Sequence, residues 1–231
     1  MKLHIATFVV AAALLAAPAH ALNEPVWLQI NGGGANYGMT DLNDELRTAN
    51  EANAGTGFAY PLLRNGLGLG FAIGIEFQNR WSFGVGLDRL FAETSASDAS
   101  GALRYQFTAN AWRGFAEYSL RPLGAHSLRF GFGAGVLGES GKLTVSIPDD
   151  APSDYRITGA GPLYEASAGG DFWATPQFAI TSAFGYRYAK LKSVNLEGDV
   201  FISANGEAMQ LDYTGPYARV GIKLASRPQA D

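Results

Sequence analysis

The sequence contains no cysteine, and after residue 21 it contains no long uninterrupted apolar run. Without cysteine the chain can form neither a disulfide nor a thiol-linked lipid anchor. A membrane-spanning helix needs about 20 mostly apolar residues, so none is expected in residues 22–231. Lysine and arginine form no basic cluster or stripe, which argues against a nucleic-acid partner.

The first 21 residues have the organisation of a secretory signal. Lys2 precedes an apolar run at residues 5–16, and the tripeptide that ends at Ala21 fits the small-residue cleavage pattern. We therefore predict a signal peptide at residues 1–21 and one mature unit at residues 22–231. The alternative, an N-terminal membrane anchor, fits less well because the apolar run is shorter than a spanning helix. Without Lys2, 16 of the 17 basic residues remain against 21 acidic ones, a net charge of −5.

Strict alternation of large apolar residues with small or polar ones dominates residues 67–91. Every odd position from 67 to 77 holds Leu, Ile or Phe, and the even positions hold Gly, Ala, Glu or Gln. After a break at Asn79-Arg80 the pattern resumes, and only Arg89 interrupts its apolar row. Because a period of two is the signal of a β-strand, this stretch predicts a hairpin.

The composition of the two alternating faces indicates the class of protein. A soluble sandwich buries its bulky face and turns long polar side chains into water, but here the second face is mostly glycine and alanine. A small membrane barrel needs bulky residues toward lipid and small or polar residues toward a narrow lumen. The hairpin is therefore predicted to be part of a transmembrane β-barrel wall.

Along the rest of the chain the same alternation predicts eight strands. In the fourth strand the apolar parity changes, which predicts a β-bulge near Ala111, and Gly215-Pro216 predicts a second parity change. Polar residues 93–100 are predicted to form a loop, and glycine-containing residues 138–141 are predicted to interrupt the fifth strand. The expected strand ranges are 26–35, 67–77, 81–91, 103–120, 128–147, 157–173, 178–188 and beyond, and 209–224.

Residues 40–53 have a different period, because Leu42 and Leu46 fall at helical spacing. We predict a short amphipathic helix in the first long loop, with Thr40 or Asp41 able to cap its start. The alternative is an irregular, solvated loop, since short helices are marginally stable by themselves.

An even number of strands places both chain ends on one side, and short and long connections alternate as in outer-membrane barrels. The signal peptide, the alternation in residues 67–91 and 178–188, and the final strand at 215–224 resemble the small eight-stranded bacterial outer-membrane barrels of the OmpX, OmpW and OmpA-membrane-domain kind. The resemblance implies an all-β, antiparallel, up-and-down transmembrane barrel with long extracellular loops at the surface of a Gram-negative cell. Such chains usually finish on an aromatic residue, whereas this one continues past Leu224.

Ten charged residues fall on the predicted inward face. When successive strands are placed alternately down and up, residues of opposite charge meet at three heights along the barrel: at the periplasmic end, at mid-height and higher. At the highest level Asp88 is the expected partner of Arg187. Buried charges must be paired and eight strands leave little room inside, so we interpret the set as a structural plug. The alternative is a thin polar conduit or ligand site, for which Arg113→Ala or Glu165→Ala raises single-channel conductance. The ten residues are Glu76, Asp88, Arg113, Glu117, Arg129, Glu165, Asp171, Arg187, Arg219 and Lys223.

Sequence signals of catalysis and of metal binding are weak. Small barrels that resemble acyl hydrolases or acyltransferases need a histidine near the outer leaflet, usually with a serine and a carboxylate. Only His126 follows the predicted signal peptide, and it stands beside Ser127 in a predicted periplasmic turn. Asp149, Asp150 and Asp154 cluster in a loop but lack the glycine and final glutamate of a calcium loop. We predict no enzyme activity, no cofactor and no metal site.

The long loops are therefore the expected working surface. Residues 40–53, 143–157 and 194–209 would stand above the membrane, where an open strand edge can pair with a partner. We predict a structural or surface-interaction role for a monomer surrounded by outer-membrane lipid and lipopolysaccharide. The alternative is a narrow, porin-like pore, or passive transport of small or hydrophobic solutes through the lumen or laterally through the wall.

Overall fold

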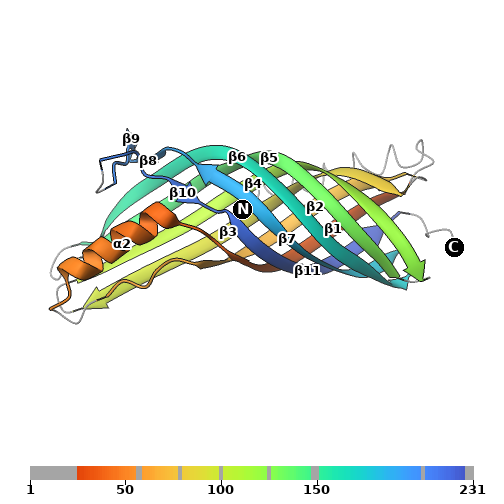
Figure 1. The fold of residues 1–231 in the computed structure, drawn as a ribbon, viewed down its shortest axis with the longest axis horizontal. Helices are drawn as coiled ribbons and strands as arrows, with labels where there is room; N and C mark the ends of the chain where they lie inside the picture. The colour runs from red at the N-terminus through yellow and green to blue at the C-terminus, as the bar shows by residue number, and fades with distance from the viewer. Residues whose placement is uncertain are drawn as a thin grey trace.

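The computed structural model describes residues 25–55, 59–77, 80–98, 101–123, 126–146, 151–203 and 206–226. The predicted signal peptide lies outside these ranges. Eight long strands form a closed antiparallel ring, which confirms the predicted up-and-down barrel (Figure 1). The strands of the ring are β1 Val26–Asn36, β2 Asn65–Glu76, β3 Trp81–Asp98, β4 Gly101–Leu123, β5 His126–Ser146, β6 Ser153–Thr175, β7 Phe178–Leu191 and β11 Gly215–Ala225.

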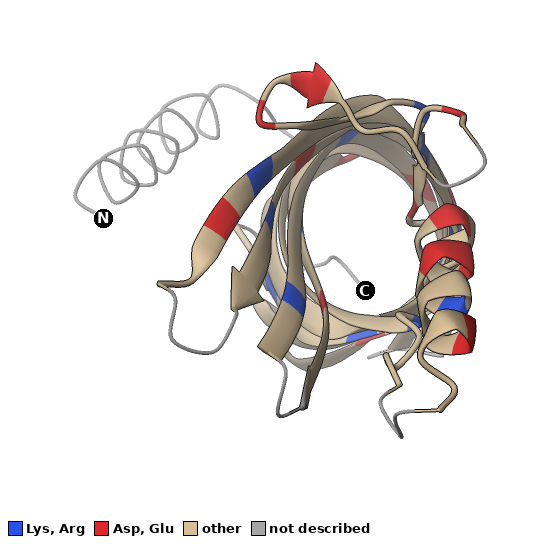
Figure 2. Cartoon of the chain, turned by 90° about the vertical axis from the view of Figure 1, so that its left-hand side faces the viewer, with Lys and Arg blue, Asp and Glu red and all other residues tan. Residues whose placement is uncertain are grey.

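Pairing of the first strand with the last closes the ring. β1 pairs with β11 from Trp27↔Ala225 to Ala35↔Tyr217, and with β2 along its other edge. Figure 2 shows the closed ring from its end. Closure matters because hydrocarbon offers no partner for a free backbone N–H or C=O group. No helix in the described ranges is both long and apolar enough to cross a membrane.

The two ends of the barrel differ. Val26 and Ala225, the outer ends of β1 and β11, lie with the short connections that follow β2, β4 and β6, so this is the periplasmic end. The opposite end carries the longer connections and all the additional elements, which Figure 1 shows beside and beyond the ring. These elements are the helix α2 Thr40–Ala52 and the short strands β8 Val194–Leu196, β9 Asp199–Val200 and β10 Leu211–Asp212.

The strands run farther toward the extracellular end than predicted. β3 and β4 stay paired as far as Asp98↔Gly101, so the loop predicted at residues 93–100 is wrong. β5 continues through residues 138–141 and pairs with β6 as far as Val145↔Ser153, so the predicted interruption is wrong as well. Both hairpins project beyond the part of the wall that faces lipid.

The bulge predicted near Ala111 is also wrong, because the register of β4 is continuous on both sides of that residue. Phe107, Ala109 and Ala111 all stay on the inward face and are 3%, 0% and 0% exposed. The apolar parity in the sequence changes because the surroundings of the strand change. Above the bilayer the outer face meets water, so the apolar residues move to the inner face.

The last strand follows the same rule. Tyr213 and Tyr217 lie on either side of Gly215-Pro216, and both are buried inside the barrel. The parity change predicted there is therefore wrong, and inward residues keep odd numbers from Leu211 onward.

The barrel thus consists of two halves of opposite polarity. In the membrane half, large apolar side chains such as Phe132 and Phe184 are 69% and 65% exposed on the outer wall. In the extracellular half the outer wall is polar, with Ser140 exposed, while the interior is apolar. We call this interior the upper core. Its buried members are Tyr37, Met39, Leu42, Leu46, Leu63, Leu90, Ala92, Phe107, Ala109, Ala111, Leu137, Leu143, Ile157, Leu163, Ala189, Leu191, Val194, Met209, Leu211 and Tyr213.

Helix α2 confirms the helical spacing seen in the sequence, and it buries Leu42, Asn43 and Leu46. The predicted cap is wrong, because Met39 occupies the N-cap position in a left-handed conformation and no side chain bonds to the helix start. The Asp41 carboxylate instead accepts a 3.1 Å hydrogen bond from the backbone N–H of Gln210. This bond ties α2 to the segment before β10.

Candidate functional site

The lumen of the membrane half holds two groups of ion pairs below the upper core. We call them the middle cluster, formed by Asp88, Arg113, Glu165, Arg187 and Arg219, and the lower cluster, formed by Glu117, Arg129, Asp171 and Lys223. The alternation placed these residues on inward positions, and the structure brings nine of the ten predicted residues into these two clusters.

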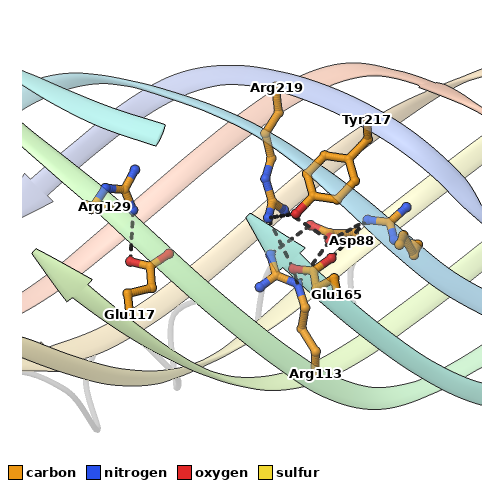
Figure 3. Close-up of polar contacts among 8 residues, drawn as sticks. Asp88, Arg113, Glu117, Arg129, Glu165, Tyr217 and Arg219 are labelled. Atoms are coloured by element: carbon orange, nitrogen blue, oxygen red, sulfur yellow. Dashed lines mark hydrogen bonds and ion pairs between the residues drawn. The ribbon is translucent and has the colours of Figure 1, made fainter. Parts of the chain in front are cut away.

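The middle cluster joins three arginines to two carboxylates. Oδ2 of Asp88 lies 3.2 Å from Nε of Arg113, 3.3 Å from Nη2 of Arg187 and 3.4 Å from Nη1 of Arg219. Glu165 bridges the same cations, with Oε1 2.9 Å from Arg113 and 3.1 Å from Arg219, and Oε2 3.4 Å from Arg187. Figure 3 shows Arg113 and Arg219 reaching the two carboxylates from different strands.

Tyr217 fixes two of these arginines. The guanidinium carbons of Arg187 and Arg219 lie 5.1 Å and 4.8 Å from the centre of its ring, within the range of cation–π attraction. Arg219 also donates a 3.1 Å hydrogen bond to the Tyr217 hydroxyl. The tyrosine therefore restricts the rotamers of both cations.

The lower cluster lies toward the periplasmic end. Arg129 pairs with Glu117 at 2.8 Å and with Asp171 at 2.9 Å, and Lys223 pairs with Asp171 at 3.1 Å. Nζ of Lys223 also lies 4.4 Å from the centre of the Trp27 ring. These contacts hold a lysine that is 2% exposed, which only a paired charge tolerates.

The predicted position of Asp88 and Arg187 along the barrel axis is wrong. Asp88 and Arg187 do pair, but they share the middle cluster with Arg113 and Glu165 and do not form a third, higher layer. The tenth predicted residue, Glu76, is buried at the periplasmic end of β2 and is 6% exposed.

Glycines opposite the charged residues provide their space. A Cβ atom at Gly70 would lie 2.2 Å from Oδ1 of Asp88, and one at Gly133 would lie 3.0 Å from Cγ of Glu165. The small inward residues of the alternation are therefore required by the volume of the long side chains beside them.

Sequence reasoning missed Glu139, the carboxylate of the upper core. It is 5% exposed, accepts a 2.6 Å hydrogen bond from the Tyr213 hydroxyl at Oε2, and accepts a 3.2 Å bond from the backbone N–H of Thr108 at Oε1. Burial raises the pKa of Glu139 to about 7, against the opposing effect of these two hydrogen bonds. Its odd number on β5 was the available signal, but the predicted interruption at residues 138–141 concealed it.

The residues that the sequence offered as weak catalytic or metal-binding candidates do not come together in one site. His126 lies at the periplasmic start of β5, with its ring 5.0 Å from that of Phe172. Asp154 is exposed and forms an ion pair of 2.7 Å with Lys142, while Asp149 and Asp150 lie outside the described residues. Within the described ranges, no group of three or more His, Asp or Glu side chains is arranged to hold a metal ion.

Comparisons with known proteins find similarity in structure alone. No protein-family model matches the chain, and no curated protein matches it. Neisserial surface protein A is 12% identical, with 86% of this chain and 96% of that chain covered and a TM-score of 0.43. The attachment invasion locus protein Ail of Yersinia pestis is 18% identical, with 88% and 99% covered and a TM-score of 0.43. The outer membrane protease OmpT of Escherichia coli is 10% identical, with 88% and 97% covered and a TM-score of 0.45.

The chain's own geometry is that of a small outer-membrane barrel. Its ring is closed, its outer wall is apolar over the membrane half, and its lumen is charged and too narrow for a wide channel. These three properties together place it in the outer membrane of a Gram-negative cell.

Proposed function

We propose that this barrel is a non-enzymatic anchor that presents a rigid interaction surface outside the cell. The observation that carries the proposal is the change of polarity along the barrel. The extracellular half has an apolar interior and a polar exterior, as a water-soluble domain has, and α2 packs onto it through Leu42 and Leu46. A rigid projection of this kind presents side chains to a partner with little loss of conformational entropy.

The segment from β8 to β10 is the part of this surface best suited to a partner. β8 adds to the extracellular edge of β6, and among the described residues β9 pairs with β8 alone. Val200 and Ile202 are 50% and 53% exposed there, although both stand outside the membrane half. Ile202 forms a β-bridge with Ala208, so within the described residues the edge open to a partner is that of β9. Exposed apolar side chains beside such an edge favour recognition by strand addition.

The experiment uses bacteria that display the protein, tested for adherence to cultured cells and to surfaces coated with extracellular matrix. The double variant Val200→Ser with Ile202→Ser should lose most of the adherence of the wild type. Tyr155→Ser is the matched control, because Tyr155 is an exposed apolar residue (39%) on the same side of the membrane. Equal adherence of the three strains, with equal amounts of each protein displayed at the cell surface, would contradict the proposal.

The interior favours a structural role for the lumen over a pore. The arginines and carboxylates of the middle cluster have side chains that are 4% to 11% exposed. Above them, Leu137 and Leu163 of the upper core are 0% exposed. A conducting path would have to disrupt both layers.

A second candidate function is lateral passage of a hydrophobic solute. The β2–β3 ladder ends at Leu67↔Phe91 while β3 continues, and a pocket of about 320 Å³ lies at this step. Its lining includes Gly66, Ala92 and Phe107. Because Ala92 and Phe107 belong to the upper core, passage requires core side chains to move. Uptake of a fluorescent fatty acid into proteoliposomes, compared with protein-free vesicles, tests this candidate directly.

A further inference from the structure

A small cavity lies at the wall formed by β1 and β2, next to the middle cluster. Its volume is about 30 Å³, enough for one water molecule or one small ion. Gly33 and Gly68, which pair across the β1–β2 ladder, both line it without a side chain. The lining also includes Tyr37, Arg187 and Arg219.

Three residues of this lining each carry a buried donor that has no hydrogen-bond partner among the residues that the structure describes. The donors are the hydroxyl of Tyr37, the Nε–H of Arg187 and the Nε–H of Arg219. Tyr37 and Arg187 are 2% and 4% exposed, so both side chains are buried. Leaving one such donor unsatisfied costs about 1–3 kcal/mol, and three around one cavity indicate a ligand that accepts hydrogen bonds.

Asn31 also lines the cavity, and its Nδ2 has no partner either. Its Oδ1, however, lies within 2.5 Å of the point that a Cβ of Gly70 would occupy, and Oδ1 of Asp88 lies within 2.2 Å of the same point. Turning the amide by 180° would direct Nδ2 to this carboxylate. The inference therefore rests on the tyrosine and the two arginines.

The charge of the surroundings identifies the kind of ligand. The middle cluster contains three guanidinium groups and two carboxylates, an excess of one positive charge within the cluster. Asp88 also lines the cavity, but all three arginines already pair with it. A cation would be repelled by the unpaired donors and by the excess positive charge. An anion would accept hydrogen bonds from the donors and neutralise the excess charge.

We propose that this cavity binds one small inorganic anion of the halide type, held by the Tyr37 hydroxyl and the Nε–H groups of Arg187 and Arg219. The anion completes the charge balance of the middle cluster and stabilises the barrel from within. Its size limits the site to a monatomic ion, so sulfate and phosphate do not fit. The site is independent of the extracellular surface discussed above.

The direct test uses the purified barrel crystallised with sodium bromide in place of chloride. Anomalous diffraction at the bromine edge should show one peak within hydrogen-bonding distance of the Tyr37 oxygen and the two Nε atoms. Electron density there without an anomalous peak would mean that the cavity holds water, and would overturn the proposal. A peak only at the outer surface would mean an adventitious ion and would overturn it equally.

A measurement in solution gives an independent result. The thermal unfolding midpoint in detergent is followed during titration with sodium chloride against sodium gluconate at constant ionic strength. We expect a saturable increase with chloride and bromide in the wild type. An identical midpoint in all three salts would contradict the proposal.

Two variants separate the cavity from general effects of salt. Gly68→Ala places a Cβ 3.3 Å from Cδ2 of Leu90, a flexible contact, and reduces the cavity without removing a donor. Its halide response should disappear, and Tyr37→Phe should weaken halide affinity roughly tenfold by removing one hydrogen bond. Gly114→Ala is the matched control, because its Cβ meets only the Gly84 oxygen at 4.0 Å, and it should respond as the wild type does. A full response in Gly68→Ala would exclude this cavity as the site.

Discussion

Tyr213 donates a 2.6 Å hydrogen bond to Glu139 inside the upper core, and thereby joins the segment before β11 to the middle of β5. The two residues are 74 positions apart in the sequence. Glu139 is a buried carboxylate surrounded by apolar side chains, beside outward residues such as Ser140 that already face water. Its protonation therefore connects the stability of the extracellular half to pH.

We predict that Glu139 makes the barrel less stable as pH rises. Burial raises its pKa from the ordinary value of 4.5 to about 7, so the folded chain holds the proton more tightly than the unfolded chain. The free energy of unfolding should fall as pH rises from about 4.5 through 7 and level off above 7, by about 3 kcal/mol at most. Glu139→Gln should remove this part of the pH dependence in urea titrations. The exposed Glu93→Gln serves as control, and an unchanged slope in Glu139→Gln would contradict the assignment.

The change of polarity along the outer wall predicts different effects of one substitution at two sites on β5. Phe132→Arg places a charge against lipid and should destabilise the barrel by about 2–4 kcal/mol. Ser140→Arg, on the same outer face eight positions later, should change stability by less than about 0.5 kcal/mol because Ser140 faces water. Unfolding in urea with lipid vesicles measures both, and equal losses would show that the lipid boundary lies higher.

Removing a carboxylate of the middle cluster should be strongly destabilising. Glu165→Ala leaves Arg113, Arg187 and Arg219 sharing Asp88 alone, and the loss of a buried ionic partner costs about 3–5 kcal/mol. Glu93→Ala, which breaks an exposed pair with Arg104, should cost less than about 1 kcal/mol. Similar losses from the two variants would mean that the cluster is hydrated.

The barrel should remain non-conducting when an arginine of the middle cluster is removed. Arg113→Ala widens the charged layer, but the upper core above it remains apolar and packed. In planar bilayers, wild type and Arg113→Ala should both show no single-channel steps. Discrete openings in either protein would favour the conduit interpretation over the structural plug.

Asn43 should be essential for docking of the first extracellular segment. Its side chain accepts a 2.8 Å hydrogen bond from the N–H of Leu63 and donates one of 2.9 Å to the Leu63 carbonyl. Asn43→Ala should therefore destabilise the docked α2 by about 1–3 kcal/mol, because two buried backbone groups lose their partner. Protease cleavage within residues 37–64 on intact cells should become faster. Asp44→Ala, on the exposed face of the helix, should leave the cleavage rate unchanged.

The sequence by itself determined the strands, the face of each strand that meets lipid, and the inward position of the ten lumen charges. These are local properties, because the pleat of a strand assigns alternate residues to opposite faces. Phe132 and Gly133 show this directly, since their neighbouring positions alone predict which one is exposed. The same rule led to errors at Ala111 and at residues 138–141, where the pattern reversed on an uninterrupted strand.

Only the tertiary structure decided which residues meet across the lumen and where the lipid ends. Asp88 joins Arg113, Arg187 and Arg219, which are 25, 99 and 131 positions away. Contacts between residues so far apart in the sequence depend on the stagger of the whole ring, which no single strand encodes. The same holds for Glu139, because its place in the upper core is known only once β5 is seen to continue through residues 138–141.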